Sequence, residues 1–414
     1  MSARFASDAA SLRDTAIALA VTLAIQIFTS LASTATPVLA PDIGRDLGVA
    51  PRLVGVFVGL VYIGSMIASL AAGQFIHRHG AIRVSQVAVL ICSVGIAIVA
   101  SASSTAIVLL ALAPVVIGLG YGPITPASSH VLARTTPPSR MALTFSIKQT
   151  GVPAGAAIAG ALLPTLAGAL GWRAAFIALS VTGVVIAIAS QPSRRQLDGE
   201  VATTARPFSL RELLSPLRVL VSHHRLRELS ITGFVYAATQ MCLMSFLVVY
   251  LTESLQLSLV AAGLALTTAN LGGIVGRIVW GAIADHLGAP RLMLAIIGLI
   301  AGACSLLAAA FDAGGSAWLR LAVCALFGAT AIGWNGVQLS EIARQAPEGQ
   351  AGPITGASGF ITFSGVVLGP PTFALLASMS GSYRVGFAVF GTLNLLCGIA
   401  LLWRRSRRAA SATR

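Results

Sequence analysis

Twelve long apolar runs constrain the fold of this chain more than any other feature of its sequence. A helix that crosses the hydrocarbon core of a bilayer needs about 20 mostly apolar residues. Runs of about this length cover residues 15–39, 52–76, 82–101, 105–127, 141–169, 173–190, 228–252, 258–284, 291–311, 317–343, 353–379 and 384–403. We therefore expect an all-α integral membrane protein with twelve transmembrane helices.

The composition agrees with a hydrocarbon environment. Of 414 residues, 56% are hydrophobic and only 10% are charged, whereas typical soluble domains have about 25% charged residues. A net charge of +14 would favour nucleic acid in a soluble chain, but here the arginines gather between the apolar runs, which is typical of membrane topology. The sequence contains no nucleotide-binding loop, metal-ligand cluster or nucleophile–base pair, so we expect neither an enzyme nor a cofactor.

The basic residues predict the orientation of the chain. If both termini lie on one side of the membrane, that side holds 20 of the 27 lysines and arginines and the other side holds five. Basic loops stay in the cytoplasm, so we expect a multi-pass protein of the inner (plasma) membrane with both termini cytoplasmic. The expected parts are an N-terminal segment 1–14, six-helix bundles 15–190 and 228–403, a cytoplasmic linker 191–227 and a basic tail 404–414. In the linker, residues 208–214 are expected to form a short amphipathic helix at the membrane surface.

An internal repeat supports two similar halves. The segment after the second apolar run matches the segment after the eighth, 208 residues later; the matched sets are Gly73, His77, Arg78, Gly80 and Arg83, and Gly281, Asp285, Gly288 and Arg291. Two further matches follow in order, Leu132–Arg134 with Ile342–Arg344 and Trp172–Phe176 with Tyr383–Phe387. Three ordered matches indicate a duplicated six-helix unit.

On these motifs the chain resembles the major facilitator superfamily (MFS) of secondary transporters over about residues 15–403. The resemblance implies two six-helix bundles that open a central cavity to each side in turn. In the family, the loop acid pairs with basic groups and helix ends across the two halves and stabilises one facing state. The second copy keeps this acid as Asp285, whereas the first has His77, so this contact is expected to be weaker or sensitive to pH in the first half, or else a plain tight turn.

Two cations lie inside the apolar runs, where charges are costly and usually functional. Lys148 and Arg277 each lie eight residues, about 12 Å along a helix, from a predicted cytoplasmic helix end. The deepest acids, Glu253 and Glu341, lie near helix ends. We therefore expect the transported solute to supply the negative charge. Alternatively, Lys148 extends to the interface, and Arg277 bonds to helix carbonyls or pairs with Glu341.

The resemblance adds to this reading. Family members that carry small organic anions use an arginine of helix 8, the helix that holds Arg277, and helices 5 and 8 border one side of the cavity. Lys148 has no assigned match in those carriers. Further expected solute-binding residues lie on predicted cavity-lining helices, each with an interhelical hydrogen bond as its alternative role; they are Gln26, Thr34, Tyr62, Tyr121, Gln149, Tyr236, Gln240, Asn270, Asn335 and Gln338.

The predicted function is secondary transport of a small organic anion, a mono- or dicarboxylate, by a monomer. Protons or a counter-anion are the expected coupling partners, with uniport as the alternative, and no nucleic acid is expected. His130 is a candidate for the titrating group. The alternative is proton-coupled efflux of drugs or other small molecules. Against it, the arginine that the family's drug exporters carry in helix 4 is replaced by Pro114, and the Gly151–Gly155 segment lacks their following proline.

Overall fold

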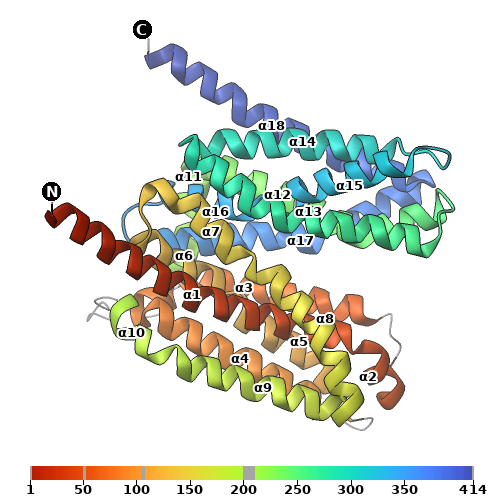
Figure 1. Cartoon of the computed structure of the whole chain (residues 1–414), viewed down its shortest axis with the longest axis horizontal. Helices are drawn as coiled ribbons and strands as arrows, with labels where there is room; N and C mark the ends of the chain where they lie inside the picture. Colours follow the sequence, from red (N-terminus) through yellow and green to blue (C-terminus); the bar gives the residue numbers. More distant parts are fainter. Residues whose placement is uncertain (1, 50–52, 104–107, 199–209, 413–414) are drawn as a thin grey trace. The chain divides into compact units, whose positions relative to one another are not determined.

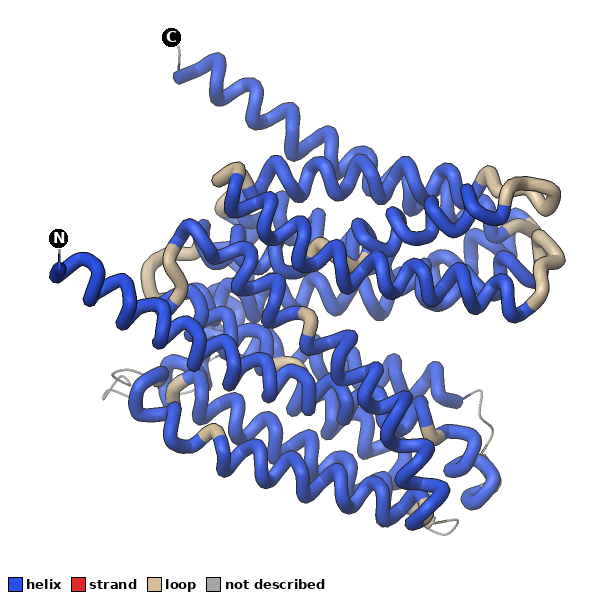
Figure 2. The backbone as a smooth tube through the Cα atoms, viewed as in Figure 1, coloured by secondary structure: helices blue, strands red, loops and turns tan. Residues whose placement is uncertain are grey.

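The computed structural model describes residues 2–49, 53–103, 108–198 and 210–412, which form helices and no strand (Figure 2). Twelve helices or pairs of consecutive helices are long and apolar enough to cross a membrane. They fall on the twelve predicted runs, with most ends shifted by a few residues and the fourth span extending to Thr135 instead of residue 127, so the predicted fold class is confirmed. Figure 1 labels the helices along the chain.

The first half of the sequence supplies six of these spans. Their helices are α1 (Ser2–Val38), α3 (Val54–His79), α4 (Ala81–Ala100), α5 (Val108–Tyr121) with α6 (Ile124–Thr135), α7 (Met141–Gln149) with α8 (Gly151–Leu170), and α9 (Trp172–Ala189). A short α2 (Ala40–Leu47) follows α1, and a 3-10 turn, Pro138–Arg140, precedes α7.

The second half supplies the other six spans. Their helices are α12 (His224–Glu253), α13 (Leu259–His286), α14 (Pro290–Ala309), α15 (Ala317–Ala331) with α16 (Asn335–Gln345), α17 (Ala351–Ser380) and α18 (Tyr383–Ala412). Between the halves lie α10 (Gln191–Leu197) and α11 (Leu210–Ser222). The amphipathic helix expected at 208–214 is therefore longer in the structure, while residues 199–209 and the side chains of 1–12, 210–212 and 404–414 lie outside the described residues.

Three spans are interrupted near their middle. The fourth breaks at Gly122 and Pro123, the fifth at Thr150, and the tenth at residues 332–334. A proline in a helix removes a backbone hydrogen bond, which explains the first break. Such breaks place helix ends inside the membrane span, where transporters of this architecture often bind solutes.

The chain divides into two compact units, each with its own core. Unit 1 comprises residues 1–137, 148–222 and 343–360, and unit 2 comprises 138–147, 223–342 and 361–414. Each unit thus includes one short segment from the other half of the sequence. Unit 2 contains most of α7, and unit 1 contains the first turns of α17.

Equivalent hydrogen bonds bear out the sequence repeat at the last span of each half. In unit 1, Trp172 Nε1 donates to Asp46 Oδ2 over 3.2 Å, and Arg173 Nη2 donates to the carbonyl of Ala102 over 3.0 Å. In unit 2, the hydroxyl of Tyr383 donates to Glu253 Oε2, and Arg384 Nη2 donates to the carbonyl of Phe311, each over 2.9 Å. The aligned residue pairs therefore anchor α9 and α18 in the same way.

Candidate functional site

Lys148 is held inside unit 1 by two amide side chains. Its side chain is only 1% exposed, and Nζ donates to Gln26 Oε1 over 2.7 Å and to Gln149 Oε1 over 3.1 Å. Gln26 comes from α1, so the ammonium group links the first and fifth spans. It lies in the last turn of α7, where a helix end favours positive charge. The alternative that Lys148 extends to the membrane surface does not fit these contacts.

A glycine lets Gln26 come close to the fifth span. A Cβ at Gly151, the first residue of α8, would lie 3.0 Å from Cβ and Cγ of Gln26. Nearby, Ser30 Oγ donates to the carbonyl of Val152 over 2.6 Å. These contacts fix α1 against the break in the fifth span, so Lys148, Gln26 and Gln149 form one polar group at that break.

Arg277 lies in unit 2, on α13, and is 2% exposed. The residue before it, Gly276, contacts the broken tenth span: a Cβ there would collide with the backbone of Ala329. A Cβ at Gly333, inside that break, would in turn lie 3.0 Å from the carbonyl carbon of Gly276. On α13, Arg277 therefore directly follows a residue that packs beside the interruption of the tenth span. Glu341, four residues before the end of α16, is also buried, at 5% exposure.

An aromatic and amide group fills unit 2 near the same break. Trp334 packs edge to face on Tyr236, with ring centroids 5.7 Å apart, and donates from Nε1 to Gln240 Oε1 over 3.2 Å. Tyr236 donates to the carbonyl of Leu294 over 2.8 Å, and Gln338 Nε2 donates to that of Leu229 over 2.8 Å. Tyr236 and Gln338 thus make the interhelical hydrogen bonds of the alternative reading. Sequence reasoning missed Trp334, although its place after Gly333 inside a long apolar run is a detectable signal.

Two of the remaining candidates form hydrogen bonds within their own helices. Asn270 Nδ2 donates over 3.0 Å to Leu266 and Thr34 donates over 2.6 Å to Ser30, each within its own helix. Tyr62 and Tyr121 are partly buried on α3 and α5. Asn335 is partly buried at the start of α16, and its Oδ1 accepts no hydrogen bond from the described residues.

The second copy of the loop motif binds the start of α7 within unit 2. The carboxylate of Asp285 accepts the N–H groups of Ala142 over 3.0 Å and Leu143 over 2.7 Å. A Cβ at Gly281 would lie 2.7 Å from Cβ of Ser146, so this glycine permits a close approach of α7. Gly288 has a φ of +56° at the turn, and Arg291 forms an ion pair with Glu228.

The first copy makes different contacts within unit 1. His77 packs edge to face on His130, with ring centroids 5.9 Å apart. Gly73 lies against α17, where a Cβ would come within 2.7 Å of Cα of Pro353. Arg78 and Arg83 are exposed.

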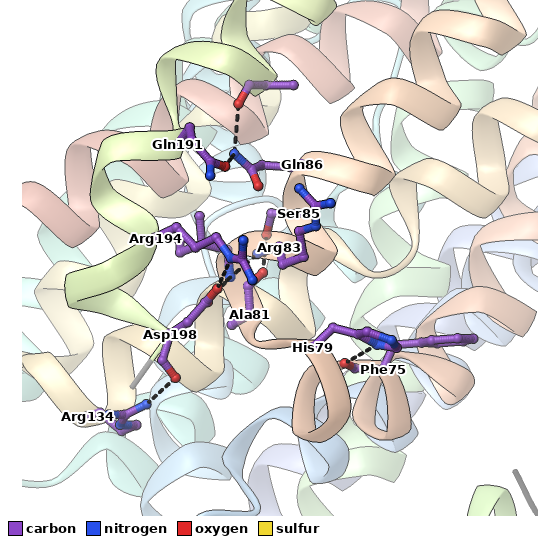
Figure 3. A network of polar contacts seen from close by, with 12 residues as sticks. Phe75, His79, Ala81, Arg83, Ser85, Gln86, Arg134, Gln191, Arg194 and Asp198 are labelled. Atoms are coloured by element: carbon purple, nitrogen blue, oxygen red, sulfur yellow. Dashed lines mark hydrogen bonds and ion pairs between the residues drawn. The ribbon is translucent and has the colours of Figure 1, made fainter. Parts of the chain in front are cut away.

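An acid outside the motif, Asp198, contacts the helix that follows the first copy. The carboxylate of Asp198, just after α10, accepts the N–H groups of Ile82 over 2.6 Å and Arg83 over 3.3 Å and so caps α4 (Figure 3). Arg194 Nε lies 3.4 Å from its Oδ2, and Arg134 Nη1 donates to its carbonyl over 3.3 Å. Gly80, at φ +87°, leaves the space that this carboxylate occupies. Burial raises the pKa of Asp198, although its hydrogen bonds and Arg194 act in the opposite direction.

Comparison with known proteins agrees with this architecture. A hexuronate transporter of Bacillus subtilis is 21% identical over 385 residues, which cover 89% of each chain. A probable anion transporter 6 of rice, Oryza sativa subsp. japonica, is 24% identical over 273 residues, 61% of this chain and 64% of the relative.

Solved structures share the fold at low sequence identity. The fucose:proton symporter FucP of E. coli superposes with a TM-score of 0.75 at 17% identity, covering 94% of this chain and 99% of the symporter. The human organic anion transporter TETRAN gives a TM-score of 0.74 at 16% identity with the same coverage. The family profile of the Major Facilitator Superfamily matches residues 22–370 and, in a second match, 229–414. The chain therefore belongs to the Major Facilitator Superfamily and is a multi-pass membrane protein of a transporter family.

Proposed function

We propose that the protein is a secondary transporter of a small organic anion, a mono- or dicarboxylate, and that Lys148 and Arg277 bind the negative charge of the solute. The observation that carries the proposal is one buried cation in each unit, at 1% and 2% exposure, next to an interrupted span. Charges inside membrane spans are costly and mark solute or ion pathways. The guanidinium of arginine suits a carboxylate because it donates two parallel hydrogen bonds.

The relatives favour the same class of solute. The Bacillus protein is a hexuronate transporter, and the rice protein is a probable anion transporter. A hexuronate combines a carboxylate with several hydroxyl groups. The amides of Gln26, Gln149 and Gln240 suit such hydroxyls, so hexuronates are the first solutes to test, followed by simple mono- and dicarboxylates.

The roles of the surrounding residues follow from their contacts. Gln26 and Gln149 hold the ammonium of Lys148 in place through their oxygens. We assign Tyr236, Trp334 and Gln338 to the packing of unit 2, and the partly buried Gln240 and Asn335 to solute contacts near the break. The transporter is proposed to act as a monomer in the inner or plasma membrane, with both termini in the cytoplasm and protons or a counter-anion as coupling partners.

Uptake into proteoliposomes tests the proposal. Carboxylates should compete with a labelled hexuronate or carboxylate, and cationic dyes should not. Arg277→Gln should abolish uptake, and Lys148→Gln should raise KM about tenfold, equivalent to about 1.4 kcal/mol, while Lys148→Arg should retain most affinity. Arg140→Gln, which changes an exposed turn, is the matched control. Normal uptake by Arg277→Gln, or competition by cationic dyes alone, would contradict anion transport and favour the efflux alternative.

A further inference from the structure

Two glutamines near the middle of membrane spans each bind a hydrogen-bond donor through the oxygen of their amide. Gln26 lies on the first span and accepts at its Oε1 from Lys148 Nζ over 2.7 Å. Gln240 lies on the seventh span and accepts at its Oε1 from Trp334 Nε1 over 3.2 Å. Trp334 shares this N–H with the carbonyl of Ala331, 3.1 Å away. The first and seventh spans begin the two halves of the sequence, so the same arrangement occurs once in each half.

The donors fix the direction in which each amide points. A lysine ammonium and an indole N–H can only donate hydrogen bonds, so a carboxamide must turn its oxygen, and not its nitrogen, toward them. The Nε2 group of Gln26 therefore points away from Lys148, and that of Gln240 points away from Trp334. Within the part of the chain that the structure describes, neither Nε2 donates a hydrogen bond to another residue. Each glutamine thus has amide N–H donors left for an acceptor from outside the described chain.

Other buried glutamines use their amides in the opposite way. Gln338 Nε2 donates to the carbonyl of Leu229 over 2.8 Å, and Gln86 Nε2 donates to that of Ala187 over 2.9 Å. These bonds tie neighbouring spans together, which is a common role of polar side chains in membrane helices. Near the middle of a span, lipid offers no acceptor, and an N–H group without one is costly. Transporters of this architecture bind their solutes at that depth, so water or solute oxygen atoms are the acceptors available to the first two amides.

We propose that the Nε2 groups of Gln26 and Gln240 donate hydrogen bonds to uncharged oxygen atoms of the solute. Lys148, in addition to its contact with the solute charge, and Trp334 are the positioning residues that set the polarity of these amides. The inference rests on the proposed function and narrows the solute to a carboxylate with a further oxygen acceptor: a keto acid, a hydroxy acid or a sugar acid. An acid with only a hydrocarbon chain would leave the amide donors without an acceptor, which lowers its affinity.

Two acids of equal charge and nearly equal size test the inference on the purified full-length protein. 4-Oxopentanoate carries a ketone oxygen that only accepts hydrogen bonds, whereas 4-methylpentanoate has a methyl group in its place. Calorimetric titration should give a Kd about tenfold lower for the keto acid, which is the effect of about one neutral hydrogen bond. Equal Kd values for the two acids would overturn the inference and leave anion transport standing. Binding of neither acid would contradict the proposed function itself, and this inference with it.

Glutamate variants separate recognition of the solute from packing. In Gln26→Glu the carboxylate still accepts from Lys148, so the Tm should not fall below that of the wild type, but no amide N–H remains. Gln240→Glu makes the same change beside Trp334. The preference for the keto acid should fall to about one in the variant whose amide meets the ketone and in the double variant, and a preference of about tenfold in the double variant would overturn the inference. Gln350→Glu, the same change of charge at an exposed position, is the control and should keep the wild-type preference.

Substitutions of the positioning residues test their role while leaving both amides in place. Lys148→Arg still donates to Gln26 and should keep the preference for the keto acid. Lys148→Gln can donate or accept, and Trp334→Phe has no N–H, so each should lower the preference from about tenfold to about threefold. A purely structural role would lower the Tm and leave the preference unchanged, and this result for both variants would overturn the positioning role. Should a glutamate variant not fold, methionine at the same position also removes the amide, and the wild-type comparison of the two acids needs no variant.

Discussion

The two copies of the loop motif share their glycines and last arginine but not their electrostatic surroundings. In the second copy, Asp285 belongs to the motif and binds the first N–H groups of α7. In the first copy, His77 contacts His130 instead, and the nearby carboxylate is Asp198, which caps α4. One acid therefore holds the start of a helix from the other half of the sequence, and the other holds a helix of its own half.

In both copies, the first glycine contacts the fifth span of the other half of the sequence. Gly281 lies against Ser146 of α7, and Gly73 lies against Pro353 of α17. Sterically, the duplicated unit has kept this approach in both halves, while the charged groups around it have changed. In this repeat, the glycines have the same packing role in both copies, whereas the charged residues make different contacts.

Substitution of the shared glycines should cause the largest losses of thermal stability and uptake. Gly281→Val and Gly73→Val each place a Cβ within 2.7 Å of a carbon atom on the facing helix, and overpacking of this kind costs about 1–3 kcal/mol. We expect both variants to lose thermal stability and uptake, measured on purified protein and in proteoliposomes.

A matched control for these variants is Gly160→Val on α8, because no atom lies within 4 Å of a Cβ there. Its Tm should stay close to that of the wild type. If Gly73→Val is tolerated while Gly281→Val is not, the steric similarity of the two copies breaks down.

Substitution of the motif acid should lower the thermal stability less than the glycine substitutions do, and mainly in the second copy of the motif. Asp285→Asn removes the negative charge at the first turn of α7, where a carboxylate cap contributes about 1 kcal/mol. His77→Asn should change stability less, because His77 is exposed and caps no N–H group in the described residues. Thermal unfolding of the two variants beside Asp312→Asn, an exposed control, measures the difference. Equal losses from Asp285→Asn and His77→Asn would show that the two copies act alike.

Much of the fold was predictable because the thickness of the bilayer sets the minimum length of a transmembrane helix. Twelve runs of about 20 apolar residues define the spans without any tertiary information, and the matches of Trp172 with Tyr383 and Arg173 with Arg384 identify contacts that the structure repeats. Lys148 and Arg277 were also evident as the two cations inside apolar runs, and the structure buries both. Their proposed role in solute binding stays a prediction.

The hydrogen-bond partners of the site residues could not be predicted from the sequence. Gln26 lies 122 residues from Lys148, and Asp198 lies 116 residues from Ile82, so neither contact follows from helical periodicity. The capping of α4 by an acid outside the motif is a property of packing, because it depends on the position of α10 beside the start of α4. Likewise, Trp334 lies 94 residues from its hydrogen-bond partner Gln240, so the sequence could mark Trp334 but could not predict this contact.

The smallest expected effect concerns the titration of Asp198. Burial raises its pKa above the ordinary value of 3.8, so the folded protein holds the proton more tightly than the unfolded chain does. Stability from this group is therefore fully present below pH 3.8 and is lost as pH rises through the raised pKa. The side chain at position 198 cannot titrate in Asp198→Asn. The Tm of this variant minus that of the wild type should therefore increase as the pH rises from about 4 to about 7.

Arg195→Gln is the matched control, because it changes the neighbouring helix α10 and leaves the contacts of Asp198 in place. Its Tm should follow the pH dependence of the wild type. A constant difference between Asp198→Asn and wild type over this range would mean that the hydrogen bonds from Ile82 and Arg83 and the charge of Arg194 offset the burial. In that case Asp198 would stay ionised like an ordinary carboxylate, and the acids of the two halves would differ in the helix they cap but not in their titration.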